Sequence, residues 1–332
     1  MLPTSYRKLV VKKLSTNFKE AIEIVEAALP EPGVGQLLVQ NLHAGMNASV
    51  GQLTGGYYPN TPPVPFDLMT EAAGYVVAVG PDVTSFKVGD PVVVPTGAGF
   101  GEYQLVGQAQ TFAVTEATPE VTAFLISGLT ASISLEQVGE MKSGETVLVT
   151  AAGGGTGQFA VQLAKFAGNH VIGTCSTADK VALLKDLGCD RVINYRQESL
   201  HEVLKTEYPR GLNLVYESVG RETFDTALNH LARFGRLLAI GSVSEYATGV
   251  ESVNKPRIYS KLIFKSASLR GFFLPHYYKH FATHLARLSE LYKQGQLKVS
   301  IAPTKFKGLE QAGDANDYLH GGGSSGKVIL SY

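Results

Sequence analysis

Four of the five residues from 153 to 157 are glycines, and this cluster separates two apolar segments. The segment before it, 145–151, is a continuous apolar run typical of a buried strand, whereas 157–167 carries helical spacing. A helix that starts directly after such a turn has unpaired backbone N–H groups and a positive dipole end. Glycines let a pyrophosphate approach that end closely, so the sequence predicts a dinucleotide-binding turn.

The segments after this turn alternate between strand-like and helical patterns. The predicted strands are 170–175, 191–195, 212–220 and 236–241, and the predicted helices between them are 178–188 and 222–235. Single helices between strands are typical of βαβ units with right-handed crossovers, which build a parallel sheet. This half of the chain is therefore predicted to be a doubly wound α/β domain.

The first hundred residues have a different rhythm, with short β-branched runs that end at glycine or proline. The predicted strands are 36–45, 72–80 and 90–97, and their spacing is typical of a β-barrel. The segment 57–66 contains four prolines and is predicted to be a loop, because proline cannot donate to a β-ladder. A chain of 332 residues with two such halves is expected to form two domains.

Charge and cysteine content narrow the class of protein. Lys and Arg number 29, as do Asp and Glu, so we expect neither nucleic acid nor an acidic membrane surface as a partner. We expect no secretory or peroxisomal signal and no bilayer-spanning segment. Two cysteines cannot build a disulfide framework, which is typical of a reducing compartment, and we therefore expect a cytoplasmic protein.

Specific residues can be assigned to the predicted nucleotide site. Gly154 and Gly157 allow close approach of the pyrophosphate, and Thr156 adds a hydroxyl. An NAD site has an acidic residue at the end of the second strand, but this chain has Ser176 there and Lys180 in the helix that follows. A hydroxyl and an ammonium suit a 2′-phosphate, so the predicted cofactor is NADPH.

Several motifs in order resemble the zinc-free medium-chain dehydrogenase/reductases, in particular their prostaglandin-reductase and ζ-crystallin-type quinone-oxidoreductase branches. They include LVVKKLSTNF, EPGVGQLLVQNLHAGMNAS, SGETVLVTAAGGGTGQFAVQLAK, GCDRVINY, YESVG and GKVIL. The resemblance implies a GroES-like β-barrel catalytic domain from residues 1–122 and 274–332. It also implies an inserted Rossmann domain at 123–273, an active-site cleft between the domains and a homodimer.

The resemblance also implies cofactor contacts at positions that match the family's motifs. Thr156 would face the pyrophosphate. The residues implied around the 2′-phosphate are Ser176, Lys180 and Tyr195. Those implied along the nucleotide groove are Ser218, Ile240 and Tyr246. Those implied near the nicotinamide are Asn47, Thr130, Phe272, Phe273 and Leu274. Ser325 occupies the position before GK where the family usually has Asn.

The chain departs from the family pattern at two places. Val50 stands where relatives commonly have an acid after Asn47, and MTEAAG replaces G-x-E-G-x-G, so that Glu71 and Gly74 remain but two glycines do not. Both departures border the expected cleft, so they bear on the substrate.

No metal site is expected. Both cysteines lie in the α/β half, and Thr70 stands before Glu71 where zinc-dependent relatives have His, so both zinc ligand sets are missing. His276, His280 and His284 have i, i+4, i+8 spacing on a predicted helix, but the outer pair would lie about 12 Å apart and cannot share one ion.

Without zinc, hydride must go to an acceptor that stabilises its own negative charge, such as an α,β-unsaturated carbonyl or a quinone. Tyr58 is the predicted hydrogen-bond donor to that oxygen, by family position, with Asn47 as its companion. The leading hypothesis is an NADPH-dependent enone reductase acting on a small hydrophobic substrate. The alternatives are a quinone oxidoreductase, a biosynthetic reduction or cyclisation enzyme, and a nucleotide-binding protein with little reductase activity.

Overall fold

The computed structural model describes residues 2–246, 248–249 and 252–332, which form two compact units. Unit 1 comprises 1–126 and 301–332, and unit 2 comprises 127–300. These limits differ from the predicted domain boundaries, slightly at residue 122 and by more at residue 273. The second boundary lies later because the segment before residue 300 is fastened to unit 2. There, the side chain of Gln162 hydrogen-bonds to the backbone of Lys298, and that of Gln158 to the backbone of Ser300.

Unit 1 is built on two β-sheets. The larger sheet has the order β15-β16-β3-β5-β6-β8, with β7 also paired to β3, and the smaller has the order β2-β1-β4. The strands of the larger sheet are β3 (Gln36–Met46), β5 (Thr70–Val79), β6 (Pro91–Gly97), β7 (Tyr103–Gly107), β8 (Phe112–Ala113), β15 (Phe306–Lys307) and β16 (Val328–Ser331). Those of the smaller sheet are β1 (Ser5–Val11), β2 (Ile22–Ala28) and β4 (Phe66–Asp67).

Short helices complete unit 1. They are α1 (Phe18–Ala21), α2 (Ser49–Thr54), α3 (Pro119–Ala123) and α11 (Ala312–His320), with 3₁₀ turns η1 (Gln108–Gln110) and η6 (Leu309–Gln311). A core of buried side chains that includes Met46, Leu53, Leu68 and Val328 packs where the two chain segments of the unit meet. Antiparallel pairing of β3 with β16 places Met46 opposite Val328. As a result, the end of β3, the start of β5 and the start of β16 lie together, because Ala44 pairs with Ala72.

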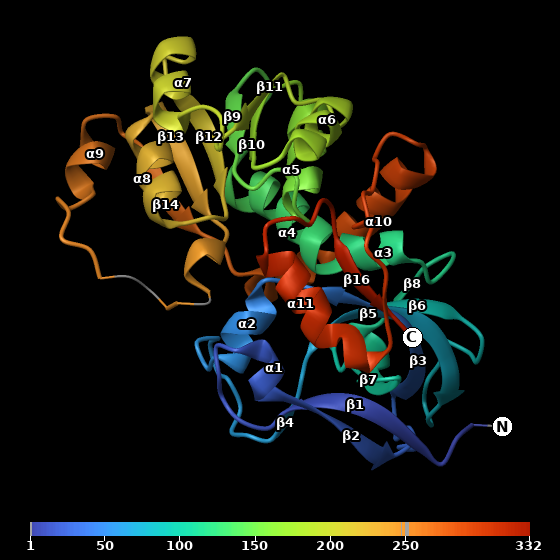
Figure 1. The fold of residues 1–332 in the computed structure, drawn as a ribbon. Helices are drawn as coiled ribbons and strands as arrows, with labels where there is room; N and C mark the ends of the chain where they lie inside the picture. The colour runs from blue at the N-terminus through green and yellow to red at the C-terminus, as the bar shows by residue number, and fades with distance from the viewer. Residues whose placement is uncertain (1, 247, 250–251) are drawn as a thin grey trace. The chain divides into compact units, whose positions relative to one another are not determined.

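Unit 2 contains a six-stranded parallel sheet with the order β11-β10-β9-β12-β13-β14, which confirms the predicted doubly wound topology. Its strands are β9 (Thr146–Val149), β10 (His170–Cys175), β11 (Arg191–Asn194), β12 (Leu212–Glu217), β13 (Leu231–Ala239) and β14 (Ser268–Gly271). Figure 1 shows α5 (Gly157–Phe166) and α6 (Ala178–Asp186) beside β9 to β11, and α8 (Arg221–Asn229) beside β12 and β13.

The remaining helices of unit 2 are α7 (Leu200–Glu207), α9 (Tyr259–Ile263) and α10 (Phe281–Lys293), with 3₁₀ turns η4 (Val243–Glu245) and η5 (Leu274–His280). The predicted helix 222–235 is too long, because Leu231 already pairs with Leu212 as part of β13. The three histidines do not share one α-helix: His276 and His280 lie in η5, which is kinked at Tyr277, and only His284 lies in α10.

One continuous helical stretch runs from Pro119 to Val138 through α3, η2 (Phe124–Gly128), α4 (Leu129–Ile133) and η3 (Ser134–Val138). Among the described residues it is the one helix long and apolar enough to cross a membrane, with a mean hydropathy of 1.3 in its apolar window. However, 83% of that window is buried inside the protein. Such burial is typical of a core helix.

Candidate functional site

The predicted cofactor residues of unit 2 gather at one edge of its parallel sheet. Ser176 follows β10, Tyr195 follows β11, Ser218 follows β12, Ile240 follows β13 and Phe272 follows β14. The strands are parallel, so all five positions lie at the carboxyl edge, where open α/β sheets bind their ligands. This arrangement comes from the strand order alone and does not depend on any side-chain detail.

The backbone of the glycine turn after β9 leaves no room for a side chain at residue 157. A Cβ on Gly157 would lie 2.5 Å from the carbonyl oxygen of Ala151 and 2.6 Å from the Cα of Ala152. Gly154 is less crowded, since its Cβ would lie 3.2 Å from the same oxygen. Thr156 is the N-cap residue of α5 and forms no side-chain cap, so its hydroxyl does not occupy the first N–H groups of the helix. The turn therefore fits a pyrophosphate.

A buried polar atom lies close to this turn. The hydroxyl of Tyr216 on β12 is fully buried, and none of the described residues gives it a hydrogen bond of good geometry. Burial raises the pKa of this phenol, although the side chain of Thr156 is near enough to lower it. A buried hydroxyl without a partner is costly, so a polar group brought by a ligand or water would stabilise the turn.

Two cations lie at the corner formed by the ends of β10 and β11. Ser176 is buried, and Lys180 is half-buried, with its aliphatic chain close to Gly153. Burial lowers the pKa of the Lys180 ammonium, and the nearby guanidinium of Arg196 lowers it further. Tyr195 stands beside them with 55% of its surface exposed. Ser176, Lys180 and Arg196 thus form a positive corner suited to a phosphate group.

Arg196 was missed by the sequence analysis. It follows Tyr195 directly, and its backbone N–H donates to the side chain of Asn194 at 3.1 Å. The parallel register that pairs Cys175 with Asn194 brings it to the same corner as Ser176. Its place in the sequence could have predicted this position, because residues that directly follow neighbouring parallel strands lie at the same edge of the sheet.

The turn after β12 is held by a buried carboxylate. Glu217 accepts hydrogen bonds from the backbone N–H of Val219 at 2.8 Å and of Gly220 at 3.1 Å. Burial raises its pKa. Ser218 is tied to β9 in turn, since its N–H donates to the hydroxyl of Thr150 at 2.9 Å. This segment is therefore rigid where the sequence analysis predicts a nucleotide groove.

The other predicted groove and nicotinamide residues of unit 2 have distinct settings. The N–H of Ile240 donates to the Glu217 carbonyl at 2.8 Å, and the hydroxyl of Tyr246 accepts from the Ser242 N–H at 3.2 Å. Phe272 stacks on Tyr277 with ring centroids 4.9 Å apart. Two predicted residues, Phe273 and Leu274, come next in the chain at the start of η5, and Thr130 is buried within α4.

Unit 1 holds the predicted catalytic residues, and the structure brings them to one pocket of about 90 Å³. Its apolar lining includes Val50 and Met69, and the polar side chains that line it are Asn47, Ser49, Tyr58, Thr70 and Thr96. Tyr58 also packs against the core of the unit, whereas its neighbour Tyr57 is 60% exposed and does not line the pocket. Of the three positions at which the chain departs from the family pattern, 50 and 69 therefore line the same cavity, whereas 72 is not part of that lining.

Behind the pocket lies a buried network that contains Asn47. The ammonium Nζ of Lys327 lies 2.5 Å from Asn47 Oδ1 and 2.6 Å from Glu71 Oε1, and Asn47 Nδ2 donates to Glu71 Oε2 at 2.6 Å. In the sequence, Glu71 stands out as part of the MTEAAG motif, whereas no role was predicted for Lys327 in GKVIL. The predicted Ser325 is partly buried two residues before Lys327.

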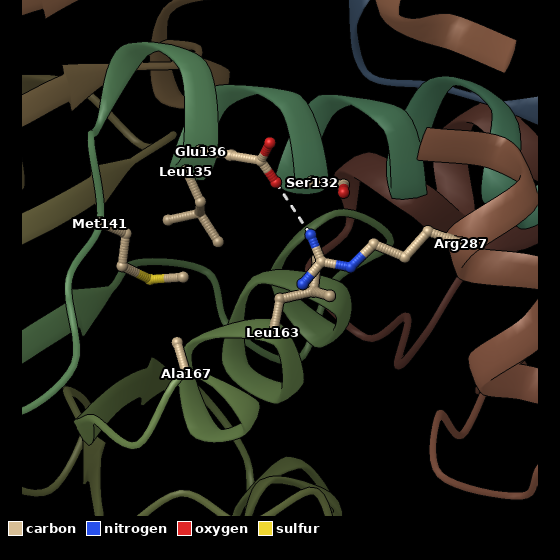
Figure 2. Close-up of a pocket in the computed structure, with 7 residues that line it drawn as sticks. All are labelled: Ser132, Leu135, Glu136, Met141, Leu163, Ala167 and Arg287. Carbon is tan, nitrogen blue, oxygen red and sulfur yellow. Dashed lines mark hydrogen bonds and ion pairs between the residues drawn. The ribbon is translucent and has the colours of Figure 1, made fainter. Parts of the chain in front are cut away.

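A second pocket, of about 130 Å³, belongs to unit 2 and contains none of the predicted site residues. Figure 2 shows its lining, in which an ion pair of Glu136 and Arg287 lies beside the apolar side chains of Leu135, Met141 and Leu163. Both ionic side chains are about half exposed. The pocket offers no buried polar group for chemistry, apart from the Ser132 hydroxyl, which is bound to His284 at 2.7 Å.

No group of three or more His, Cys, Asp or Glu side chains arranged to hold a metal ion occurs in residues 2–246, 248–249 and 252–332. His284 is directed to Ser132, and burial lowers its pKa. Cys175 and Cys189 are both buried with raised pKa values, chiefly because of that burial.

Comparisons with known proteins agree with this geometry. Residues 33–185 match the family described as alcohol dehydrogenase GroES-like domain, and 155–290 match that described as zinc-binding dehydrogenase. Prostaglandin reductase-3 of Mus musculus is 45% identical and covers 99% of this chain and 90% of its own length. A probable quinone oxidoreductase of Leishmania amazonensis is 42% identical over 99% of this chain and 98% of its own.

Among solved structures, the quinone oxidoreductase of Escherichia coli in complex with NADPH superposes with a TM-score of 0.86 at 30% identity, covering 98% of this chain and all of its own. A mycobacterial protein in complex with NADPH has the same TM-score, identity and coverage. The predicted combination of a GroES-like and a Rossmann domain is therefore confirmed.

Proposed function

The chain belongs to the medium-chain dehydrogenase/reductase family, in the branch of prostaglandin reductase-3 and the quinone oxidoreductases, and from this premise we propose that it is an NADPH-dependent reductase of activated C=C bonds. The substrate class is a small hydrophobic α,β-unsaturated carbonyl. The observation that carries the proposal is the carboxyl edge of the unit 2 sheet, where a side-chain-free turn and a two-cation corner take the place of an acidic ribose ligand.

NADPH suits the residues at that edge. The turn at Gly157 receives the pyrophosphate, and Lys180 and Arg196, with Ser176, hold the 2′-phosphate by charge-assisted hydrogen bonds. A carboxylate at this corner would repel that phosphate, and none stands at the end of β10. When bound, the cofactor supplies a hydride from its nicotinamide ring.

The pocket of unit 1 supplies the groups for the acceptor. The hydroxyl of Tyr58 donates to the carbonyl oxygen of the substrate as negative charge develops on it, and then passes a proton to the enolate. Val50 and Met69 give the pocket an apolar wall, which excludes water and favours a hydrophobic acceptor.

We further propose that the reaction needs no zinc and that the protein is a homodimer. Hydride transfer to an enone requires no metal, because the product anion is delocalised over the enolate. Two features support a dimer. The strand β14 lies at the edge of the parallel sheet, where a second chain could pair with it, and α9 with the residue that follows it exposes apolar side chains. Tyr259, Ile263 and Phe264 are 61%, 66% and 88% exposed, a costly state for large apolar groups unless covered.

A quinone is the second candidate acceptor, favoured by the 42% identical relative that carries the name quinone oxidoreductase. A quinone also delocalises the charge that hydride brings. Steady-state NADPH oxidation with an enone, with a quinone and with no acceptor separates the candidates. We expect the fastest turnover with the enone. Faster turnover with the quinone would favour the second candidate, and no turnover with either would leave a biosynthetic enzyme with another substrate or a nucleotide-binding protein.

A further inference from the structure

Asn47, Thr70, Glu71 and Lys327 form a polar cluster that is almost sealed from solvent. Lys327 is 2% exposed and Glu71 is fully buried, and the two charges lie 2.6 Å apart. The hydroxyl of Thr70 donates to the Gly45 carbonyl at 2.6 Å and lies 3.3 Å from Asn47 Nδ2. Asn47 and Thr70 also line the pocket, so the cluster connects buried charge to the pocket surface.

The space for this cluster exists because residue 45 of β3 is a glycine. A Cβ on Gly45 would overlap the Glu71 carboxylate and lie 2.9 Å from Lys327 Cε. Glycine at this position weakens β3 slightly, because it contributes no side chain and costs more backbone entropy. Taking two charges out of water is also expensive, and an apolar pair of similar size is often at least as stable. Stability alone therefore gives no reason for an ion pair here.

The cluster does fix one degree of freedom, the orientation of the Asn47 amide. A carboxylate only accepts hydrogen bonds and an ammonium only donates them. Glu71 faces the amide nitrogen and Lys327 faces the amide oxygen. A flipped amide would lose both hydrogen bonds, because its oxygen would then face the Glu71 carboxylate and its NH₂ group would face the Lys327 ammonium. Neutral partners would allow either orientation.

We propose that Glu71 and Lys327 are positioning residues for Asn47, and that they set which polar atoms of Asn47 face the substrate pocket. The proposal rests on the proposed reductase function for its kinetic consequence, but the held amide itself is independent of any activity. Neither residue touches the substrate in this assignment. Both act by keeping one orientation of the Asn47 amide, and the pocket is therefore pre-organised before substrate binds.

The test uses the full chain and the double variant Glu71→Gln/Lys327→Met, which removes both charges with little change in volume and leaves no unpaired buried ion. We expect single-turnover hydride transfer to an enone, at saturating NADPH, to slow by about tenfold or more, since small misplacements of a pocket group can cost up to about 10² in rate. NADPH affinity should change by less than about twofold, because the turn at Gly157 and the Lys180 ammonium, which would hold the phosphates, are untouched. The matched control is Lys19→Met, which removes an exposed ion pair with Asp314 in the same unit.

A second measurement does not depend on folding of the double variant. In wild-type protein labelled with ¹⁵N-asparagine, the Asn47 side-chain amide, identified by its loss in Asn47→Asp, should show one strongly downfield proton that exchanges slowly with water. An Asn47 amide with ordinary shifts and fast exchange would overturn the proposal, as would a folded double variant with the wild-type rate. If wild type reduces neither enone nor quinone, the proposed function fails, while the amide signal still decides whether Asn47 is held.

Discussion

The two candidate sites of this protein are built in opposite ways. The edge of the unit 2 sheet is made chiefly by backbone, with a glycine turn at 153–157, and its cations Lys180 and Arg196 stand partly in solvent. The pocket of unit 1 is supported by charges that solvent does not reach, Glu71 and Lys327. A site made by backbone is disrupted by substitutions that add a side chain. A site supported by buried charges is disrupted by substitutions that remove one member of an ion pair. Each of the changes below acts on one side of this contrast.

The largest effect is expected from Lys327→Met. It leaves the carboxylate of Glu71 buried without its counter-charge, and breaking a buried pair in this way costs about 3–5 kcal/mol of unfolding free energy. Urea unfolding of the full chain measures this loss. Replacing both partners, in Glu71→Leu/Lys327→Met, should restore most of it. A loss no greater than that of the exposed Lys19→Met would contradict the buried-charge account.

Gly157→Ala tests the backbone-built site. Its new Cβ meets only backbone atoms, so the turn must shift and the pyrophosphate loses its N–H contacts. We expect NADPH affinity to fall by about 100-fold, the equivalent of two charge-assisted hydrogen bonds at about 1.5 kcal/mol each. Fluorescence titration of the cofactor measures it. Gly154→Ala, in the same turn but less crowded, is the matched control and should have a clearly smaller effect.

Tyr58→Phe should slow hydride transfer by about 10-fold to 100-fold and leave NADPH affinity nearly unchanged. The hydroxyl acts on charge that develops in the transition state, and loss of one such donor typically costs about 10²–10³ in kcat. Single-turnover rates with a saturating enone measure the effect. Tyr57→Phe is the control, since that side chain lies outside the pocket. An unchanged rate in Tyr58→Phe removes this residue from the mechanism.

Lys180→Ala should lower NADPH affinity by roughly tenfold, the value of one charge-assisted contact to phosphate, and change NADH affinity little. Unlike Lys327, Lys180 is only half-buried, and both burial and the nearby Arg196 guanidinium lower the pKa of its ammonium. Its removal should therefore destabilise the protein far less than the removal of the buried Lys327. Lys185→Ala on the exposed face of α6 is the control. Equal loss of NADPH and NADH affinity would refute the 2′-phosphate assignment.

The smallest effect is expected from metal removal. Prolonged treatment with EDTA should change the rate of NADPH oxidation by less than the error of the assay, and elemental analysis should find no stoichiometric zinc. Residues 2–246, 248–249 and 252–332 form no metal-binding group of His, Cys or acidic side chains in the structure. Activity that is lost to EDTA and restored by zinc would contradict this account.

The contrast also explains what the sequence could predict. The turn at 153–157 was predictable because glycines between a strand and a helix are contiguous in the chain. The helix 222–235 was predicted too long, since helical spacing continues into residues that pair with β12. The role of Lys327 was not predictable from local patterns: it meets Glu71 only because β16 pairs with β3, across more than 250 residues of chain.

The position of β16 also bears on the order of synthesis. Residues 43–46 of β3 pair with Val328–Ser331, which are synthesised after the whole of unit 2, so this edge of β3 remains unpaired while unit 2 is being made. Chains fold from the N-terminal side as they emerge. Unit 2, whose residues are contiguous, has its full set of strands first. A nascent chain therefore carries an open strand edge and an uncompensated Glu71 until Lys327 and β16 have emerged, and chaperone contact is most valuable there.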